Sequence, residues 1–197
     1  MTLGFFEQEA LSRGYKRIAG VDEAGCGSLC GPVLAAAVIL DLKHLISDID
    51  DSKKLNPKKR ESLYKKIKEK AIGWSIGIAS AGEIDRINIR QASLRAMQRA
   101  VRKLKPQPDF LLVDGFTIPW LNIPQKGIVK GDCQSFSIAA ASILAKVSRD
   151  KIMMDYHFLH PQYNLRRNKG YPTLEHREAL KKNGASPLHR QSYRLFS

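Results

Sequence analysis

The chain has 197 residues, of which 43% are hydrophobic and 26% are charged. This length suits one domain with a substantial buried core, and this composition is typical of a globular protein. No apolar run reaches the roughly 18 residues that a membrane-spanning helix needs, and the first residues lack the basic and apolar segments of a signal peptide. We therefore expect a cytoplasmic protein that does not enter a membrane.

The charge is strongly unbalanced, because 33 Lys and Arg residues face only 19 Asp and Glu residues and give a net charge of +14. A surplus of this size favours a polyanionic partner such as nucleic acid. The basic residues form several clusters, of which about half are expected only to face solvent. These clusters are Lys53-Lys54, Lys58-Lys59-Arg60, Lys65-Lys66, Arg95 with Arg99, Arg102 and Lys103, and Arg166-Arg167 with Lys169.

The three cysteines, Cys26, Cys30 and Cys133, are an odd number and have no paired-motif spacing. This pattern favours reduced thiols in a cytosolic protein. A zinc site built on them would need a fourth ligand at a recognised spacing, and the sequence offers none.

Two apolar runs near the start of the chain predict a pair of antiparallel strands. Residues Tyr15–Val21 form the first run, and Pro32–Leu40 form a nearly unbroken second run that we expect to be buried on both faces. The glycines of Gly25-Cys26-Gly27 and the Gly31-Pro32 pair indicate turns between them. The connection is longer than that of a minimal hairpin.

A predicted charged loop at 48–54 separates this pair from the first clear helix start signal. Asn56 is a good N-cap, and Pro57 suits the first helical position. The helix that follows has a narrow apolar stripe at Leu63, Ile67 and Ala71.

A strand and a helix are predicted next. Residues Gly73–Ala81 alternate weakly and place Trp74, Ile76 and Ile78 on one face. Residues Ile89–Leu104 predict a helix, which the prolines that follow it bring to an end.

The remaining chain predicts two short strands, each ending in an acid, and two helices. Asp109–Gly115 is the first strand, and Gly127–Asp132 is the second. A long helix is predicted from Ser135 to about Tyr156, and a shorter one over Thr173–Lys182.

The element order favours an α/β domain with a mixed sheet, part hairpin and part parallel, flanked by helices. We expect this α/β domain to span residues 1–158, with a small C-terminal helical appendage over residues 159–197 packed on the same domain.

Four carboxylates share one context: Asp22 and Glu23 end the first apolar run, and Asp114 and Asp132 end short strands beside a glycine. Ligands of α/β sheets gather outside strand ends, so the carboxylates converge if the strands are neighbours. Converging carboxylates repel one another unless divalent cations bind them. Two ions about 3.5–4 Å apart can activate water and stabilise the leaving oxygen in phosphodiester cleavage. The alternative is that each acid is a turn residue, or a helix cap for Asp132.

Several blocks, taken in chain order, resemble type 2 ribonuclease H, also called ribonuclease HII. Each block is moderately specific alone, but the set covers nearly the whole chain in the family's order and is highly specific together. The blocks are Gly20-Val21-Asp22-Glu23-Ala24-Gly25 with Gly27, Gly31-Pro32-Val33, Ala35-Ala36-Ala37-Val38, Asp51-Ser52-Lys53-Lys54-Leu55, Val113-Asp114-Gly115, Lys130-Gly131-Asp132, residues 142–150, Lys169-Gly170-Tyr171-Pro172-Thr173, Glu175-His176, Ser186-Pro187 and His189-Arg190.

The resemblance implies a ribonuclease H-like fold and hydrolysis of the RNA strand in RNA–DNA hybrids. It also implies incision on the 5′ side of single ribonucleotides in duplex DNA, leaving 5′-phosphate and 3′-hydroxyl ends. Activity would depend on Mg²⁺ or Mn²⁺, with two ions in the site. We expect a monomer whose substrates are RNA–DNA hybrids and ribonucleotide-containing duplex DNA.

The resemblance also assigns roles to residues. Asp22, Glu23, Asp114 and Asp132 would be the catalytic, metal-binding acids, the same four that strand ends select. Tyr171 would stack at the ribose of the junction. The loop glycines would bring their amides close to the 2′-hydroxyl. The residues implied to contact substrate are Gly25, Cys26, Gly27, Ser52, Lys53 and Tyr171.

One position departs from the family pattern, because the family loop is Gly-Arg-Gly and this chain has Gly25-Cys26-Gly27. The arginine is expected to help hold a phosphate, and a cysteine cannot supply that charge. The departure concerns affinity and junction preference, not the metal chemistry.

Two other readings of the sequence remain open at this point. One is a non-enzymatic RNA- or DNA-binding protein in which the acids are structural. The other is a different nuclease of the same fold, such as a Holliday-junction resolvase. Dependence on divalent ions separates the first from an enzyme, and a preference for branched DNA separates the second.

Overall fold

The computed structural model describes residues 4–47, 49 and 56–196. The predicted loop at 48–54 falls almost entirely outside these ranges, and so do Ser52 and Lys53. Within them, no helix combines the length and the apolar character that crossing a membrane requires.

A five-stranded mixed sheet forms the centre of the molecule, with strand order β3-β2-β1-β4-β5. The first three strands along the chain pair antiparallel, whereas β1, β4 and β5 run parallel. The predicted mixed sheet, part hairpin and part parallel, is therefore confirmed. The strands are β1 (Ile18–Ala24), β2 (Val33–Ile39), β3 (Gly73–Ala79), β4 (Phe110–Asp114) and β5 (Gln125–Ile128).

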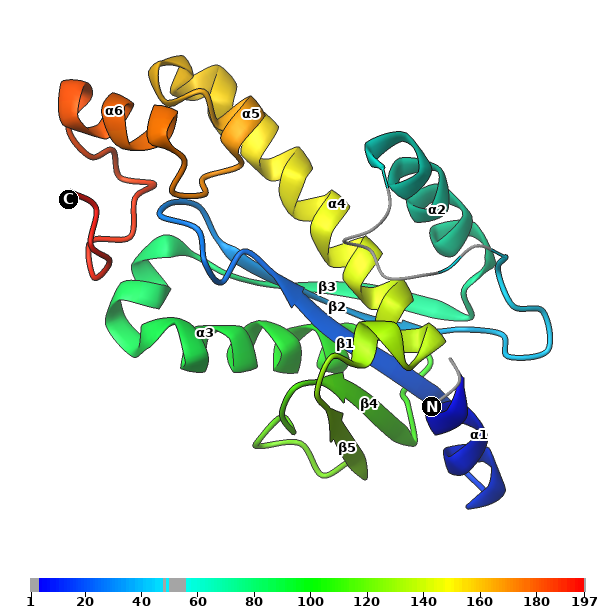
Figure 1. The fold of residues 1–197 in the computed structure, drawn as a ribbon. Helices are drawn as coiled ribbons and strands as arrows, with labels where there is room; N and C mark the ends of the chain where they lie inside the picture. Colours follow the sequence, from blue (N-terminus) through cyan, green and yellow to red (C-terminus); the bar gives the residue numbers. More distant parts are fainter. Residues whose placement is uncertain (1–3, 48, 50–55, 197) are drawn as a thin grey trace.

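Helices cover both faces of the sheet (Figure 1): α3 lies on one face, and α4, with α2 beside it, lies on the other. After α4 the chain turns back, so the next short helix lies beside the C-terminal half of α4, and the last helix lies next to it. The helices are α1 (Phe5–Ser12), α2 (Pro57–Lys70), α3 (Ala81–Lys103), α4 (Phe136–Leu159), α5 (Leu165–Asn168) and α6 (Leu174–Asn183), with 3₁₀ turns η1 (Gly131–Cys133) and η2 (Pro161–Tyr163).

Strand β2 is buried at every position, as its unbroken apolar run predicted. Its residues alternate between two cores, because successive side chains of a strand point to opposite faces. Ala35 and Ala37 pack in the core under α3, whereas Leu34 and Ala36 pack in the core under α4. The sheet is thus the middle layer of three.

Strand β3 is confirmed, although it ends at Ala79, and its small residues are the ones that face α3. Trp74 and Ile78 are 36% and 42% exposed, whereas the alternate positions are buried. At Gly77 an added Cβ would lie 2.0 Å from the carbonyl oxygen of Ala96. The helix approaches this strand so closely that a larger side chain does not fit.

Helix α3 begins earlier than predicted and has a kink. It starts at Ala81, where the Ser80 side chain accepts the Glu83 amide, and it is interrupted at Asn88 (φ 64°, ψ 164°). The Asn88 side chain then accepts the amide of Gln91 and begins the second segment. The predicted helix from Ile89 matches this second segment only.

The predicted start signal of α2 and the predicted start of α4 at Ser135 are confirmed. Asn56 caps α2 by accepting the Lys59 amide at 2.8 Å, and Pro57 is its first residue. Ser135 caps α4 by accepting the Ile138 amide, so the predicted alternative that Asp132 caps this helix is wrong.

The predicted strand over Gly127–Asp132 is also wrong in its extent. Strand β5 ends at Ile128, and Asp132 lies in the 3₁₀ turn η1. The physical reason is that Lys130 adopts a left-handed conformation (φ 55°), which ends the extended backbone before the acid is reached.

The C-terminal segment shares a core with the rest of the chain. The predicted helix at Thr173–Lys182 is confirmed as α6, whereas α1 and α5 carried no recognised signal. Side chains of the segment, including Leu165 and Leu180, pack with Leu29, Cys30 and Met153. The division at residue 158 stays a prediction.

Candidate active site

The parallel pairing of β1 with β4 brings three of the four predicted carboxylates together. Val21 of β1 is paired with Val113 of the parallel strand β4, so Asp22 and Asp114 occupy the next positions on neighbouring strands. Glu23 follows directly on β1. The predicted convergence at a strand-end edge is therefore confirmed for these three acids.

The raised pKa of Asp22 reflects the convergence of these three acids. Its side chain is buried, and its pKa lies well above the ordinary value, first because burial removes it from water and then because Glu23 and Asp114 repel its charge. Hydrogen bonds from the Glu23 amide, 2.6 Å away, and from the Ser142 side chain oppose this shift. Such a cluster is poorly suited to three negative charges without a cation.

Asp132 has a different setting from the other three acids. It is 2% exposed and does not line the cleft that they share. The loop that carries it is tied to the cluster, because the Gly131 amide donates to Asp114 Oδ1 at 2.7 Å. Asp132 therefore follows directly after Gly131, the residue whose amide contacts Asp114.

A cleft of about 320 Å³ opens at this edge of the sheet and brings most of the predicted site residues together. It contains the three converging acids, the predicted glycine loop and Tyr171. It also contains Arg60 of α2 and Lys146 of α4. The lining residues are Asp22, Glu23, Ala24, Gly25, Cys26, Gly27, Arg60, Asp114, Ser142, Lys146 and Tyr171.

The glycine loop needs glycine at its first position. Gly25 has φ +99°, which side chains rarely adopt, and an added Cβ would lie 2.1 Å from Arg149 Nε. The loop backbone is therefore packed directly on a buried arginine.

Cys26 points toward the acids, and its thiol is neutral. Its Sγ donates to Glu23 Oε1 at 3.4 Å. Burial, with the charge of Glu23, raises the pKa of the thiol to about 12. Position 26 therefore supplies no charge for a phosphate, in agreement with the expectation from the sequence.

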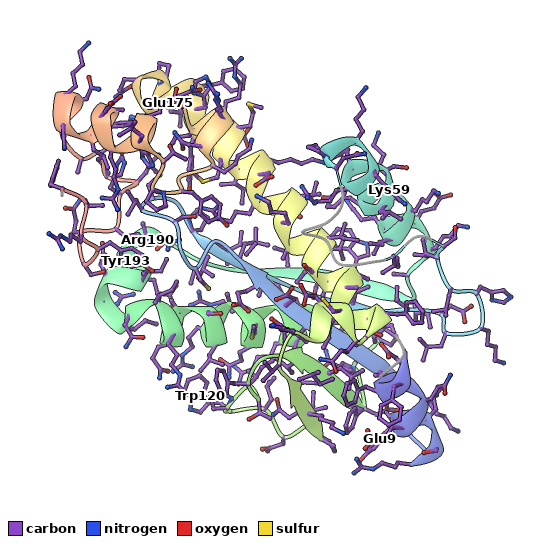
Figure 2. The ribbon with its side chains drawn as sticks, viewed as in Figure 1. Glu9, Lys59, Trp120, Glu175, Arg190 and Tyr193 are labelled. Atoms are coloured by element: carbon purple, nitrogen blue, oxygen red, sulfur yellow. The ribbon has the colours of Figure 1, made fainter. Side chains whose placement is uncertain are left out.

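Two fully buried arginines hold the loops around the cleft through their backbone carbonyls. Arg190 donates to the carbonyl oxygens of Gly25, Cys26 and Gly31 at 2.7–3.1 Å. Figure 2 shows Arg190 beside Tyr193, next to the connection between β1 and β2, and the Tyr193 hydroxyl donates to the same Cys26 carbonyl.

Arg149 makes the second set of carbonyl contacts, to Cys30, Pro32 and Lys169. It therefore connects the β1–β2 segment to the segment that carries Tyr171. Sequence reasoning missed the role of both arginines. Their positions within blocks of the resemblance were the available signal.

Tyr171 is held at the rim of the cleft by two cations. Lys146 Nζ lies 5.7 Å and Arg149 Cζ lies 5.6 Å from the centroid of its ring. Lys146 also pairs with Asp150 at 2.7 Å. The ring thus lies in the same cleft as the carboxylates and the glycine loop, and its stacking on a ribose stays a prediction.

Arg60 and Lys146 were not predicted as site residues. They come from different helices and bring positive charge to a cleft lined by three acids. The charged run 58–60 and the block 142–150 were visible in the sequence, but only the fold shows that one cation of each faces the cleft.

A larger cleft of about 620 Å³ adjoins the first and shares Glu23, Cys26 and Asp114 with it. It extends along α3, where Ile89 and Met97 line it, and gives the acids an apolar wall on the side away from Tyr171.

Comparison with known proteins agrees with this geometry. A model of the ribonuclease HII family matches residues 19–196. A ribonuclease HII of Caldanaerobacter subterraneus subsp. tengcongensis is 55% identical over 189 residues, which cover 96% of this chain and 78% of that protein. A ribonuclease HII of Syntrophus aciditrophicus is 55% identical over 192 residues, covering 98% of this chain and 91% of that one.

Solved structures show the same fold at lower identity. Ribonuclease H2 from Pyrococcus horikoshii superposes with a TM-score of 0.78 at 24% identity, covering 91% of this chain and 95% of that one. The enzyme in the PCNA:RNase HII complex from Archaeoglobus fulgidus gives 0.76 at 23% identity, covering 92% and 97%. Since the family model and the close relatives span nearly the whole chain, the protein belongs to the ribonuclease HII family and is a metal-dependent endoribonuclease that acts on RNA–DNA hybrids.

Proposed function

We propose that this enzyme incises duplex DNA on the 5′ side of a single embedded ribonucleotide and leaves 5′-phosphate and 3′-hydroxyl ends. One observation carries the proposal: a single cleft joins three converging carboxylates to a glycine loop and to the ring of Tyr171. A cleft with these parts can sense one ribose and cut the phosphodiester next to it.

The acids fit divalent cations. Hard carboxylate oxygens suit Mg²⁺ or Mn²⁺, and the raised pKa of Asp22 marks a cluster that a cation would stabilise. We propose Asp22, Glu23, Asp114 and Asp132 as the ligands. Bst-RNase HIII, which has the same fold (TM-score 0.63, 19% identity), was solved in complex with Mn²⁺. Two bound ions would supply an activated water and charge stabilisation at the leaving oxygen.

Other side chains and backbone amides of the cleft would bind and orient the substrate. The amides of Gly25 and Gly27 can approach a 2′-hydroxyl closely, because no side chain stands between. The ring of Tyr171 would pack on the ribose and orient the scissile phosphate. Arg60 and Lys146 would hold flanking phosphates. The proposed phosphate contacts of Ser52 and Lys53 stay predictions, since these residues lie outside the described ranges.

Membership of an enzyme family makes the non-enzymatic reading wrong, and the relatives reported above are ribonucleases HII, which favours this activity over that of a resolvase. We propose that the enzyme acts on its duplex substrates as a monomer. Its cytoplasmic location stays a prediction.

The test is cleavage of duplex DNA carrying one ribonucleotide, measured with Mg²⁺ and with excess chelator. An all-DNA duplex and a four-way DNA junction serve as matched substrates. We expect one Mg²⁺-dependent cut, on the 5′ side of the ribonucleotide, and no cut in either control. Cleavage of RNA–DNA hybrids without cleavage at the lone ribonucleotide would overturn the proposal.

Asp132→Asn tests the fourth ligand separately. We expect a folded protein that has lost most of its activity, because removal of a ligand disturbs both nucleophile activation and leaving-group stabilisation. Turnover close to that of the unmodified enzyme at saturating Mg²⁺ would remove Asp132 from the site.

A further inference from the structure

Two buried histidines lie behind Tyr171 and take no part in the chemistry proposed above. His176 belongs to α6 and His189 to the C-terminal segment, and their Nε2 atoms are 3.1 Å apart. Both are at most 1% exposed, and the ring of Tyr163 packs edge-on against both. The side chain of Cys30 is close enough that one ligating atom from each residue falls within 4.8 Å of the others.

The hydrogen-bond partners assign the ring protons of both histidines. His176 Nδ1 lies 3.0 Å from the carbonyl oxygen of Tyr171, which can only accept, so Nδ1 carries a proton. His189 Nδ1 accepts the backbone N–H of Ser186 at 3.0 Å, so a neutral His189 carries its proton on Nε2. The 3.1 Å contact is therefore His189 Nε2–H donating to the lone pair of His176 Nε2.

This assignment disfavours a metal ion held by Cys30, His176 and His189. A cation between the two Nε2 atoms would need a lone pair on each of them. A neutral His189 would then carry its proton on Nδ1, where it would face the N–H of Ser186 and would have only the Ser186 hydroxyl, 2.9 Å away, as an acceptor. The hydrogen-bond donors around the two rings thus favour a hydrogen-bonded pair.

We propose that His176 and His189 are positioning residues that fix the backbone of Tyr171, and through it the orientation of the ring at the cleft. This inference rests on the proposed role of Tyr171. The chain of donors runs in one direction, from the Ser186 amide through both rings to the Tyr171 carbonyl. That carbonyl also accepts the amide of Thr173 at 2.8 Å, which leaves the peptide little freedom.

The pair connects the two sides of the cleft. His189 forms a β-bridge with Cys30, which follows the glycine loop, and the Leu29 amide donates to the Gly170 carbonyl at 2.7 Å. Tyr171 is therefore held relative to the glycine loop by direct contacts from the same C-terminal segment. Movement of this segment would shift the ring against the ribose-sensing amides.

Burial keeps both rings neutral, as the proposed chain of donors requires. It lowers the pKa of His189 to about 4, with help from the neighbouring His176 and from His160, and it lowers the pKa of His176. Arg177 lowers and Glu175 raises the pKa of His176, as does the Tyr171 carbonyl. An added proton would place two N–H groups face to face.

The decisive variants are His176→Leu and His176→Asn. Leucine removes the bond to Tyr171, whereas the asparagine amide can still donate to the carbonyl from nearly the Nδ1 position. We expect His176→Leu to slow single-turnover cleavage at a lone ribonucleotide roughly tenfold or more, with duplex affinity almost unchanged. His176→Asn should recover most of that rate.

A double-mutant cycle with Tyr171→Ala separates positioning from general damage to the fold. In the Tyr171→Ala enzyme, His176→Leu should have little further effect on the single-turnover rate. Equal slowing in both backgrounds would overturn the inference. If the unmodified enzyme cleaves but Tyr171→Ala does not slow it, the role of Tyr171 fails first. Absence of ribonucleotide cleavage in the unmodified enzyme would instead refute the proposed function.

Nitrogen NMR of the ring atoms tests the pair without any activity and without a variant that must fold. At pH 7.5 we expect a proton on Nδ1 of His176 and on Nε2 of His189, unchanged by one equivalent of Zn²⁺. Two rings with the same tautomer, or a shift of both rings on adding Zn²⁺, would overturn the inference.

Discussion

At the scale of single residues, the buried carboxylate of Asp22 couples the chemistry of the site to the stability of the fold. Its pKa is raised in the folded protein, so its ionised form is disfavoured there. A carboxyl group with a raised pKa contributes stability that is fully present below its ordinary value of 3.8 and is lost as the pH rises through the folded value. At neutral pH the metal-free site therefore works against folding.

We expect Asp22→Asn to raise the melting temperature of the chelator-treated enzyme at pH 7–8, because it removes one of the repelling charges. The gain should shrink toward pH 4, where Asp22 is protonated anyway. Thermal unfolding at several pH values measures this, with Asp155→Asn on the exposed side of α4 as a control. A lower melting temperature for Asp22→Asn at pH 8 would contradict the argument.

Position 26 offers a second test at this scale, because Cys26 lines both clefts and contributes a neutral thiol. Cys26→Arg should tighten binding of a ribonucleotide-containing duplex by about ten- to hundredfold, the equivalent of a charge-assisted contact of about 1–3 kcal/mol. The gain should fall as salt rises.

Cys26→Gln is the matched control for this variant, because it adds length and polarity without charge. Binding constants at two salt concentrations decide the matter. Equal gains for arginine and glutamine would mean that charge is not what position 26 lacks.

At the scale of elements, the connection between β1 and β2 depends on Arg190, which donates to three of its carbonyls. A lysine side chain carries a single ammonium group and cannot reach all the carbonyls that the forked guanidinium contacts. Arg190→Lys therefore leaves buried carbonyls without donors. We expect a loss of about 3 kcal/mol in the free energy of unfolding. Urea unfolding measures it, with the exposed Arg194→Lys as control. Equal stability of the two variants would show that the carbonyls find other donors.

The same scale shows which elements the sequence could predict. The caps Asn56 and Ser135 act within three residues, so local chemistry was enough to place the starts of α2 and α4. The packing of β3 was not predictable, because its small residues face α3 through a contact between Gly77 and Ala96 that only the fold creates.

The candidate site divides in the same way. The ends of the apolar runs marked Asp22 and Asp114 as candidates that would converge if their strands were neighbours, and the parallel pairing of β1 with β4 shows that they are. Asp132 lies in a turn because of the left-handed backbone of Lys130, and no recognised sequence signal marks that conformation. Arg190 lies more than 150 residues along the chain from the carbonyls that it contacts, so no local sequence pattern could predict these hydrogen bonds.

At the scale of the whole molecule, a net charge of +14 surrounds a cleft lined by acids. Different residues would therefore attract the polyanionic substrate and bind the metal cations. Phosphates would be held by the basic residues at the rim, such as Arg60 and Lys146, and the carboxylates are left for metal ions.

This division predicts how duplex affinity depends on salt. Each phosphate that a cation neutralises contributes about −0.9 to the slope of log affinity against log salt. Arg60→Gln and Lys146→Gln should each make the slope shallower by about 1. Lys16→Gln should not, since Lys16 precedes β1 at the end of that strand opposite to Asp22. Titrations of a fluorescent duplex from about 50 to 200 mM salt span the range where such slopes are resolved. A slope near zero in the unmodified enzyme would mean that its basic residues serve only to keep it dissolved.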